Sequence, residues 1–117
     1  MSRADESGMA PHVVTPFEVL LHAPRIVDEL ETGKKVFWIQ RGRNLDGVLM
    51  PFKFAPLLGE IYLAQDPKLR SRDECTVRGL RWRISALIDR FDHTDYPYYV
   101  IKSKQCVAVL SSMRLYV

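Results

Sequence analysis

The sequence has few of the residues that build metal centres and disulfide frameworks. It contains two cysteines and three histidines in 117 residues. Cys75 and Cys106 show neither a CxxC spacing nor a cluster with histidine, so we expect both to be reduced, small apolar side chains. The histidines are His12, His22 and His93, which lie too far apart for metal-ligand spacing, so we expect no metal site.

Long hydrophobic runs are also missing. No apolar stretch approaches the roughly 20 residues that a membrane-spanning helix needs. Residues 1–10 are small and polar, without the apolar stretch of a signal peptide and without a helical period, and we expect them to form a disordered arm. These absences favour a soluble, cytoplasmic protein that makes no contact with a membrane.

Patterns typical of an enzyme are absent as well. The glycine-containing segment 42–47 lacks the Lys-Ser or Lys-Thr ending of a phosphate-binding loop. The serines have no histidine nearby in an arrangement that activates a nucleophile. Asp89, Asp92 and Asp95 could face one cation, but a helix C-terminus disfavours carboxylates and no fourth ligand is evident. We therefore expect neither catalysis nor a cofactor.

The composition that remains is that of a globular protein, with 47% hydrophobic and 26% charged residues. The length suits one compact unit. The net charge of +3 is unevenly distributed. Residues 1–60 contain seven basic and eight acidic residues, a charge of −1, whereas residues 61–117 contain ten and six, a charge of +4. Composition alone does not require a nucleic-acid partner, but any polyanion that binds this protein is expected to contact the second half.

The first half predicts a short strand, a helix and a hairpin. Residues 12–14 can form the strand, and Thr15 with Pro16 and Glu18 predicts a capped helix start. Pro24 should bend this helix and Gly33 should end it. The expected apolar stripe is Leu20, Ala23, Val27 and Leu30. The expected strands are residues 35–40 and 45–50, joined by a turn at 41–44.

The second half repeats this order. Thr76 predicts another N-cap. The helix after it has an apolar stripe at Val77, Leu80, Ile84, Leu87, Ile88 and Phe91. The expected strands are residues 96–101 and 106–110, with a turn at 103–105. Between the halves, we expect short helical pieces at 52–58 and 61–63 and an exposed, charged joint at 66–74.

The two halves align with one another. Residues 27–30 match 88–91 and residues 47–49 match 108–110, both at an offset of 61, and the offset slips by one in between, where Ile39 aligns with Ile101. A half of about 50 residues buries too little apolar surface to be stable alone, so we expect a shared core. We predict an α+β fold in which two helix-plus-hairpin halves form one pseudo-dimeric antiparallel sheet with the helices on one face. The predicted segments are a first repeat at 11–54, a connection at 55–74 and a second repeat at 75–117.

The order of elements and several short motifs resemble the DNA-binding domain of the Phd/YefM antitoxins. The matching stretches are residues 81–84, 97–102 and 108–110 with Tyr116 in the second half, and 17–18, 27–33, 36–42 and 48–51 in the first. The resemblance implies a bacterial or phage protein that binds operator DNA and regulates transcription. Proteins of this family also use a C-terminal segment to wrap a partner toxin, and in this feature the sequence departs from the family pattern. Relatives of this family dimerise through this domain, so the two halves would stand for two protomers.

The resemblance also implies which residues contact DNA. The family's arginine near the helix start falls on Arg81, and the same position in the first half is Leu20, which cannot contact phosphate. The family's basic residue at the end of the first hairpin strand falls on Lys102 and, in the first half, on Gln40. The predicted DNA-binding residues are Arg78, Arg81, Arg83, Lys102, Lys104, Arg41 and Arg43. The alternative is a solvated helix face whose arginines pair with Glu74, Asp89 and Asp92.

A different function remains open, in which a phage or mobile-element protein binds and inhibits a toxin or host protein. Only residues 55–69 are placed like the family's toxin-binding segment. The predicted protein-binding residues are Trp38, Leu57, Leu58, Ile61, Tyr62 and Leu63, with the aromatic segment 96–99 as a further surface.

Two further expectations concern tryptophans and assembly. Phe37 and Trp38 alternate along a strand, so one of them should face the core and the other the open face of the sheet or a partner. Trp82 is expected to pack between the two halves, the alternative being a partly exposed contact. A monomer with an internal pseudo-dimer and a homodimer both remain open.

Overall fold

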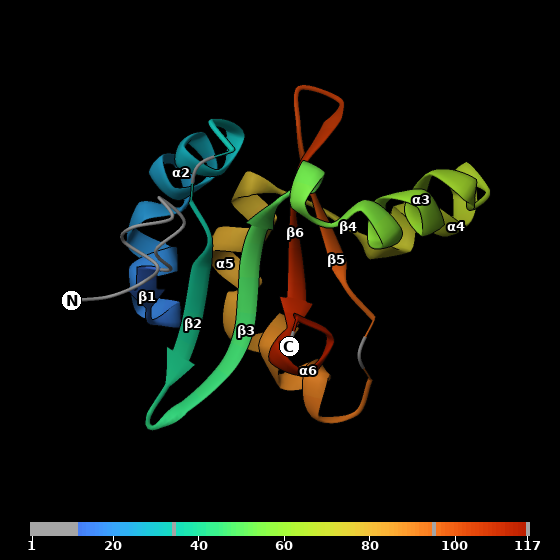
Figure 1. The fold of residues 1–117 in the computed structure, drawn as a ribbon. Helices are drawn as coiled ribbons and strands as arrows, with labels where there is room; N and C mark the ends of the chain where they lie inside the picture. The colour runs from blue at the N-terminus through green and yellow to red at the C-terminus, as the bar shows by residue number, and fades with distance from the viewer. Residues whose placement is uncertain (1–11, 34, 95, 117) are drawn as a thin grey trace.

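The computed structural model describes residues 12–33, 35–94 and 96–116, which form an α+β fold around one six-stranded mixed sheet (Figure 1). The strands are β1 (His12–Val14), β2 (Phe37–Arg41), β3 (Asn44–Pro51), β4 (Glu74–Thr76), β5 (Tyr98–Lys102) and β6 (Gln105–Ser112). The helices are α2 (Pro16–Glu31), α3 (Pro56–Ala64), α4 (Pro67–Arg70), α5 (Val77–Asp89) and α6 (Met113–Tyr116). The 3-10 turns are η1 (Phe52–Phe54), η2 (Ser71–Asp73) and η3 (Arg90–Asp92). The arm predicted at residues 1–10 lies outside the described residues.

α2 begins, bends and ends where the sequence predicts. The Thr15 hydroxyl accepts a hydrogen bond from the Glu18 N–H at 3.1 Å, and the Glu18 carboxylate accepts one from the Thr15 N–H at 3.0 Å. Pro24 lacks a backbone donor, and the helix is kinked at His22, which has φ −126° and ψ 20°. Gly33 adopts φ +71° after the last turn, the left-handed conformation that terminates a helix.

The sheet has the strand order β1-β2-β3-β6-β5-β4. Its four central strands are antiparallel, but β1 pairs with β2 and β4 with β5 in parallel, so the prediction of an antiparallel sheet was wrong for both edges. The reason is that α2 and α5 each connect an edge strand to its neighbour, and a strand-helix-strand crossover returns the chain in the same direction. Glu74, predicted to lie in an exposed joint, starts β4 and is half-buried.

The two halves are arranged symmetrically about the contact between β3 and β6. Leu49 pairs with Leu110. On one side of this pair Met50 pairs with Val109, and on the other side Val48 pairs with Ser111, so exchanging the two halves turns one flanking pair into the other. Leu49 and Leu110 are separated by the predicted offset of 61. A two-fold axis through this pair therefore relates the order of strands and helices in one half to that in the other.

The offset of 61 holds along the whole repeat. β2 and β5 span 37–41 and 98–102, and their hairpin partners β3 and β6 span 44–51 and 105–112. Both hairpins shift register at the same place, after Ile39 in one and after Val100 in the other. The predicted slip was wrong: Ile39 corresponds to Val100, and Arg41 rather than Gln40 corresponds to Lys102.

Each face of the sheet carries its own hydrophobic core. α2 and α5 pack side by side on one face, over a cluster that includes Leu30, Leu49, Leu87 and Leu110. The buried stripe of α2 is Val19, Ala23, Ile26, Val27 and Leu30. Leu20, predicted in that stripe, is half-buried because it lies beside the inward face rather than on it. Among the predicted residues of the second stripe, Val77 is half-buried and the others are buried.

The opposite face is covered in part by η1 and α3, so the prediction that helices lie on one face was wrong for α3. This second cluster contains Val36, Val48, Met50, Ala55, Tyr62, Tyr99 and Val109. Phe37 points into the first cluster and Trp38 packs against the second, as the alternation along β2 predicts. The short helical pieces expected between the halves are confirmed as η1 and α3.

The two hairpin turns give a test of local strain. Ser103 and Lys104 both have positive φ, +52° and +67°, which a two-residue turn between β5 and β6 requires and which non-glycine residues adopt at a cost. Replacing them with Asn and Gly (Ser103→Asn, Lys104→Gly) should raise the free energy of unfolding by about 1 kcal/mol, measured by urea denaturation.

The matched control is the first hairpin. Gly42 has φ +59° and nothing lies within 4 Å of the position its Cβ would occupy, so Gly42→Ala tests backbone strain without a steric clash. This substitution should lower the free energy of unfolding by about 1 kcal/mol. Equal stability of both variants and the wild type would contradict the expectation.

Candidate nucleic-acid interface

The predicted DNA-binding residues lie at two ends of the sheet. Thr76 pairs with Ile101 in the parallel ladder of β4 and β5, so α5 starts level with the end of β5. This register brings the first turns of α5 to the same end as Lys102 and Lys104. Arg41 and Arg43 belong to the other hairpin, whose turn lies at the opposite end because β2 and β5 are related by the two-fold axis.

α5 displays three arginines that have no acidic partner in the part of the chain that the structure describes. The helix is capped by the Thr76 hydroxyl, which accepts a hydrogen bond from the Gly79 N–H at 3.0 Å. Arg78 and Arg83 are exposed and Arg81 is half-buried. Within residues 12–33, 35–94 and 96–116, none of these three arginines forms an ion pair. The expected alternative was pairing with Glu74, Asp89 and Asp92. It does not occur among these residues: Glu74 accepts a hydrogen bond from Tyr62, Asp89 pairs with Arg41, and Asp92 forms no ion pair there.

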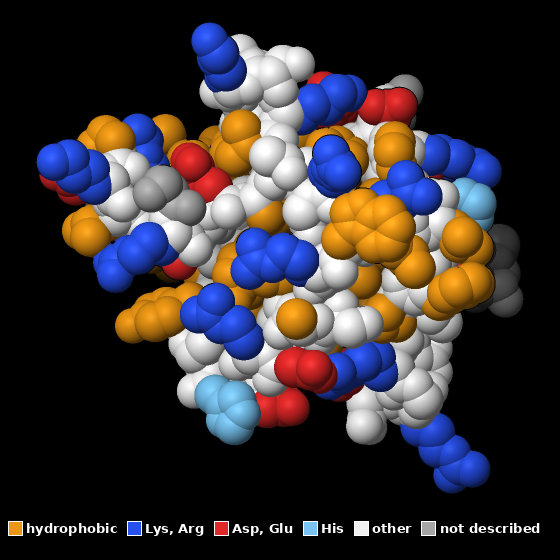
Figure 2. All heavy atoms as spheres, turned by 180° about the vertical axis from the view of Figure 1, so that it is seen from behind, with side chains coloured by type: hydrophobic (Ala, Val, Ile, Leu, Met, Phe, Trp, Pro, Cys, Tyr) orange, Lys and Arg blue, Asp and Glu red, His pale blue; other side chains and the backbone are white. Residues whose placement is uncertain are grey.

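Trp82 lies among these arginines and is 65% exposed, so the prediction that it packs between the halves was wrong. The guanidinium of Arg81 lies 5.3 Å from the centre of the indole ring, a cation–π contact that holds the arginine against the helix surface. Figure 2 shows the face that carries α2 and α5, where Lys and Arg side chains surround exposed hydrophobic ones. A surface of this kind can neutralise phosphates and offer an aromatic ring for stacking.

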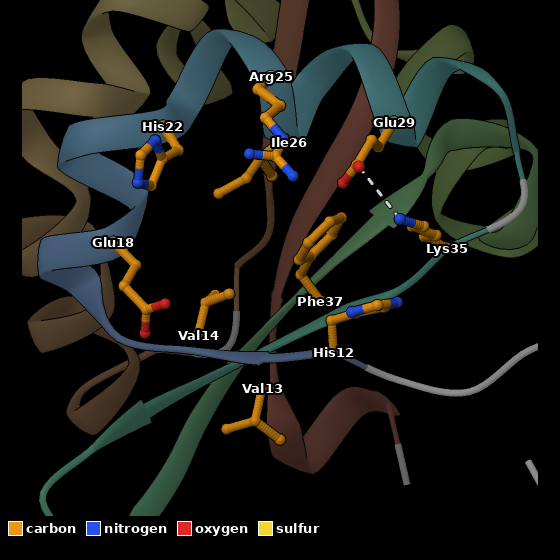
Figure 3. Close-up of a pocket in the computed structure, with 10 residues that line it drawn as sticks. All are labelled: His12, Val13, Val14, Glu18, His22, Arg25, Ile26, Glu29, Lys35 and Phe37. Carbon is orange, nitrogen blue, oxygen red and sulfur yellow. Dashed lines mark hydrogen bonds and ion pairs between the residues drawn. The ribbon is translucent and has the colours of Figure 1, made fainter.

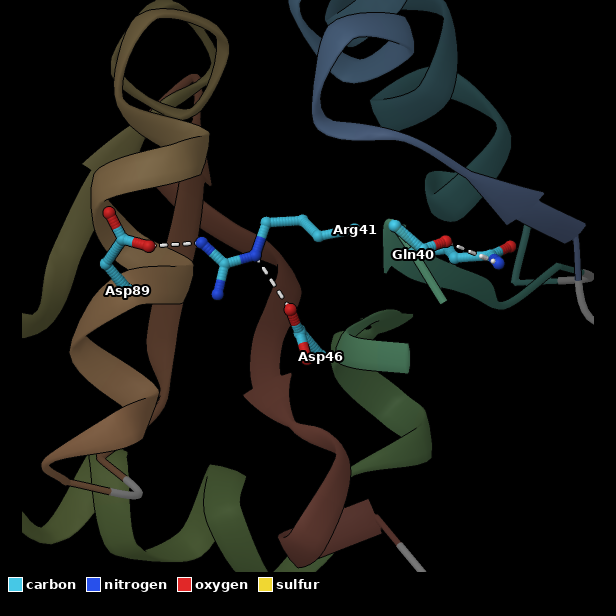
Figure 4. A network of polar contacts seen from close by, with 5 residues as sticks. Gln40, Arg41, Asp46 and Asp89 are labelled. Carbon is cyan, nitrogen blue, oxygen red and sulfur yellow. Dashed lines mark hydrogen bonds and ion pairs between the residues drawn. The ribbon is translucent and has the colours of Figure 1, made fainter. Parts of the chain in front are cut away.

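Arg41 is bonded to carboxylates on both sides (Figure 4). Its Nε donates to Asp46 at 2.7 Å, and its Nη1 donates to Asp89 at the end of α5. These two hydrogen bonds raise the pKa of Arg41 above its ordinary value. The contact with Asp89 joins the first hairpin to the helix of the second half.

Lys102 makes the corresponding contact from the second hairpin to the helix of the first half. Its Nζ donates to Asp28 at 2.8 Å and also to Glu31, both on α2. Hydrogen bonds to these two carboxylates raise the pKa of Lys102 above its ordinary value. Because Asp28 and Asp89 are 61 residues apart, as are Arg41 and Lys102, the pairs Arg41–Asp89 and Lys102–Asp28 are equivalent, and we call them the crossed ion pairs. Both are accessible to solvent, so they contribute little to stability and mainly orient the hairpins.

The predicted DNA-binding residues therefore differ in whether they are free of carboxylate partners that a phosphate would have to displace. A phosphate would have to displace carboxylates from Arg41 and Lys102, whereas Arg43 and Lys104 are exposed at the hairpin turns. In the first half, the positions equivalent to Arg78 and Arg81 are Phe17 and Leu20, and Phe17 is 63% exposed. The cluster of arginines on a helix is thus confined to the second half, in keeping with the uneven charge of the sequence.

A pocket of about 390 Å³ lies between β1 and α2 in the first half (Figure 3). Figure 3 shows Arg25 and Glu29 reaching from α2 toward β1, with Glu29 paired to Lys35 at 3.0 Å. The His12 ring lies 5.5 Å from the Phe37 ring at the floor of the pocket. The charged groups around it have both signs, so the pocket offers no clear preference for an anion or a cation.

The predicted protein-binding residues are divided between surface and core. Leu57, Ile61 and Leu63 of α3 are exposed to 67%, 47% and 62%, and Leu58 is half-buried. Tyr62 is buried, so it is not available to a partner. Trp38 is half-buried against the second core cluster.

Tyr62 is buried because α3 lies close to the sheet. Its ring centre is 4.2 Å from that of Tyr99, and its hydroxyl donates to Glu74. Burial raises the pKa of this phenol above its ordinary value, and the bond to Glu74 adds to the shift. α3 also packs on Phe52, where a Cβ at Gly59 would meet the ring at 3.0 Å, so glycine permits this close approach.

A groove between α3 and the start of β5 brings together residues that the sequence places far apart. Its volume is about 330 Å³, and its walls are Leu58, Ile61, Gln65, Asp73, Tyr96, Pro97 and Tyr99. The Tyr99 hydroxyl donates to the Leu58 carbonyl at 2.9 Å and fixes α3 to the sheet beside the groove. The apolar segment 57–63 and the aromatic segment 96–99 are the sequence patterns that could have indicated this groove. No sequence pattern indicates that Gln65 and Asp73 belong to it.

Both cysteines are free thiols. Burial raises the pKa of Cys75 to about 11 and that of Cys106 to about 12, so neither is a reactive thiolate near neutral pH. In the part of the chain that the structure describes, no three His, Cys, Asp or Glu side chains gather as a metal-binding group. Across the same residues, each helix is too short or too polar to cross a bilayer.

Comparison of the chain with protein-family models, with curated proteins and with solved structures found no match. The geometry of the site is therefore the basis on which a function can be argued.

Proposed function

We propose that this protein is an antitoxin-like, DNA-binding transcriptional regulator whose contact surface is α5 and the second hairpin. The observation that carries the proposal is the set of three arginines on α5, Arg78, Arg81 and Arg83, which lack acidic partners among the described residues. Cations that are not already neutralised can release counterions from DNA, which is the main source of affinity for a duplex.

The symmetry of the sheet supports the same proposal. The sheet consists of two β-α-β-β halves related by an axis through Leu49 and Leu110, which supports the proposal that they are counterparts of two Phd/YefM-like protomers. In that arrangement the two helices would address neighbouring segments of an operator. Because Phe17 and Leu20 replace two arginines in the first half, we propose that the second half supplies most of the phosphate contacts.

The salt dependence of duplex binding tests this function. Arg78, Arg81, Arg83 and Lys104 form no ion pair among the described residues. These four cations should give a slope of about −3.6 in a plot of log K against log salt, at about −0.9 per neutralised phosphate. Fluorescence anisotropy with a labelled duplex of about 20 base pairs, from about 50 to about 300 mM salt, measures this slope.

Single substitutions assign the contacts. Arg81→Ala should weaken binding several-fold and reduce the slope by about 1. Lys68→Ala removes the same charge from α4 and serves as the control, with affinity and slope expected to match the wild type. Absence of duplex binding at the lowest salt, or a flat salt dependence, would refute the proposed function.

We propose binding of a toxin or host protein as a second function, because Leu57, Ile61 and Leu63 expose a run of apolar surface on α3. The test is to co-express the chain with the product of the adjacent reading frame. Co-purification that is lost in the Leu57→Ser/Leu63→Ser variant and retained in Lys68→Ala would support it. Co-purification that survives the double substitution would refute this role of α3.

A further inference from the structure

The groove beside α3 continues into a second, cationic pocket. This cationic pocket has a volume of about 620 Å³ and is lined by Gln65, Arg72, Asp73, Arg90 and Tyr96. Three of its residues, Gln65, Asp73 and Tyr96, also line the α3 groove. The two pockets therefore adjoin at these three side chains, and we call them the apolar part and the cationic part of one depression.

The apolar part suits one hydrophobic side chain. Its walls include Leu58, Ile61 and Pro97, and the Tyr96 ring at its rim is 69% exposed. Its volume of about 330 Å³ is sufficient for a branched aliphatic or aromatic side chain. Burial of such a side chain there would remove apolar surface of both molecules from water.

The cationic part suits a carboxylate. The described residues that line it include two arginines, Arg72 and Arg90, and one acid, Asp73, so the charge of these residues is net positive. Among the described residues neither arginine forms an ion pair. Arg90 is held in place because its guanidinium lies 5.2 Å from the centre of the Tyr98 ring. Planar guanidinium groups bind carboxylates with paired hydrogen bonds.

A third group, where the apolar and cationic parts meet, can accept a hydrogen bond from a ligand. The Gln65 Oε1 atom is buried and accepts no hydrogen bond from the residues that the structure describes. A buried acceptor without a donor costs free energy, and a ligand N–H at this position would remove that cost. The backbone N–H of a peptide that spans both parts of the depression would lie close to this atom.

We propose that this depression binds an extended peptide segment of a partner protein in which an apolar residue is followed directly by an acidic one. The apolar side chain enters the α3 groove, the carboxylate binds Arg72 and Arg90, and a backbone N–H between them donates to Gln65. The proposal rests on the second proposed function, protein binding, and names the chemistry of the partner. It is independent of DNA binding, because Arg90 follows the end of α5 and the DNA-binding arginines lie toward its start.

Three labelled peptides of about eight residues test the proposal by fluorescence anisotropy. They share a Gly/Ser background and carry Leu-Glu, Leu-Gln or Ala-Glu at their centre. The Leu-Glu peptide should bind about tenfold more tightly than either of the others, since each of those lacks one of the two contacts. Its affinity should fall with salt, while that of the Leu-Gln peptide should change little.

Two variants separate the two contacts. Arg90→Gln should remove the preference for Leu-Glu over Leu-Gln and leave the preference over Ala-Glu. Ile61→Ser should remove the preference for Leu-Glu over Ala-Glu and leave the preference over Leu-Gln. Arg25→Gln, which removes an exposed charge from α2, is the control and should bind all three peptides like the wild type. Arg90 and Ile61 are exposed, so circular dichroism should show the wild-type fold in both variants.

Each outcome decides the proposal. Equal binding of the three peptides, or an unchanged preference in Arg90→Gln, would overturn it. Displacement of the Leu-Glu peptide by a duplex oligonucleotide would also overturn it, because the depression would then belong to the nucleic-acid surface. If no peptide binds but co-purification of the adjacent gene product still depends on Leu57 and Leu63, only this inference fails and the second proposed function stands.

Discussion

Replacing Arg78, Arg81 and Arg83 together with alanine is expected to weaken duplex DNA binding about a hundredfold. Each arginine is proposed to make one charge-assisted contact to a phosphate, and three such contacts at about 1 kcal/mol each amount to about 3 kcal/mol. The salt slope should fall by about 2.7, because three fewer counterions are released. Anisotropy titrations of the wild type and the triple variant measure both quantities.

The matched control removes three cations from other elements. Arg25→Ala/Lys53→Ala/Lys68→Ala lowers the net charge by the same amount but takes the charges from α2, η1 and α4. If DNA is attracted only by net charge, both triple variants should lose affinity equally, and the proposed interface would be wrong. If α5 is the contact surface, the control should stay within a few-fold of the wild type.

A third variant tests geometry as well as charge. Arg78→Lys/Arg81→Lys/Arg83→Lys keeps the three charges but loses the planar, bidentate guanidinium groups and the stacking of Arg81 on Trp82. Its affinity should lie between those of the wild type and the alanine variant. Because two of the three arginines are exposed, all these variants should keep the wild-type unfolding midpoint within a few degrees, which separates lost contacts from lost structure.

Local signals predicted most of the elements of this fold. The capping box at Thr15, the proline-induced kink and the two apolar stripes act within one helix, so a single sequence contains the information for them. The hairpins could be predicted for the same reason. The edge strands β1 and β4 have three residues each, and β4 was missed because its first residue, Glu74, ends the charged stretch 66–74 that predicted an exposed joint.

The contacts between the halves could not be predicted from local patterns. Arg41 and Lys102 were expected to contact DNA, and the structure shows them bonded to Asp89 and Asp28 of the opposite half. These pairs are 48 and 74 residues apart, and a charged residue has no sequence signal that distinguishes such a partner from a phosphate. DNA binding by the three arginines of α5 stays a prediction, which rests on the resemblance for Arg81 and on the cluster of cations along the helix for Arg78 and Arg83.

Sequence patterns also could not predict which face of α3 packs against the sheet. The helix is apolar nearly all round, so its sequence does not identify a buried side. Tyr62 is buried and Leu57 and Leu63 are exposed because Gly59 lets the helix approach Phe52 closely. The depression proposed to bind an acidic peptide depends on this approach, since α3 forms one of its walls.

The Leu49 and Leu110 pair gives the second large effect, on stability. Both side chains are fully buried and stand opposite one another at the two-fold axis, in the cluster that both halves share. Leu49→Ala or Leu110→Ala should each lower the free energy of unfolding by about 3 kcal/mol, the usual cost of a buried leucine that leaves a cavity. Leu57→Ala, at a position 67% exposed, is the control and should change it by less than about 0.5 kcal/mol.

The number of transitions in the unfolding curve tests the shared core more directly than the size of the destabilisation. If the halves share one core, damage on either side of the axis destabilises the whole chain, and urea denaturation shows one transition in both variants. Trp38 lies in the first half and Trp82 in the second, so fluorescence in a Trp82→Phe background follows the first half and fluorescence in a Trp38→Phe background follows the second. The two probes should shift together in each variant, and the double variant should be less destabilised than the sum of the single ones because the two side chains adjoin. Separate transitions for the two probes would show that each half folds alone, and the internal pseudo-dimer would then be the wrong description of this chain.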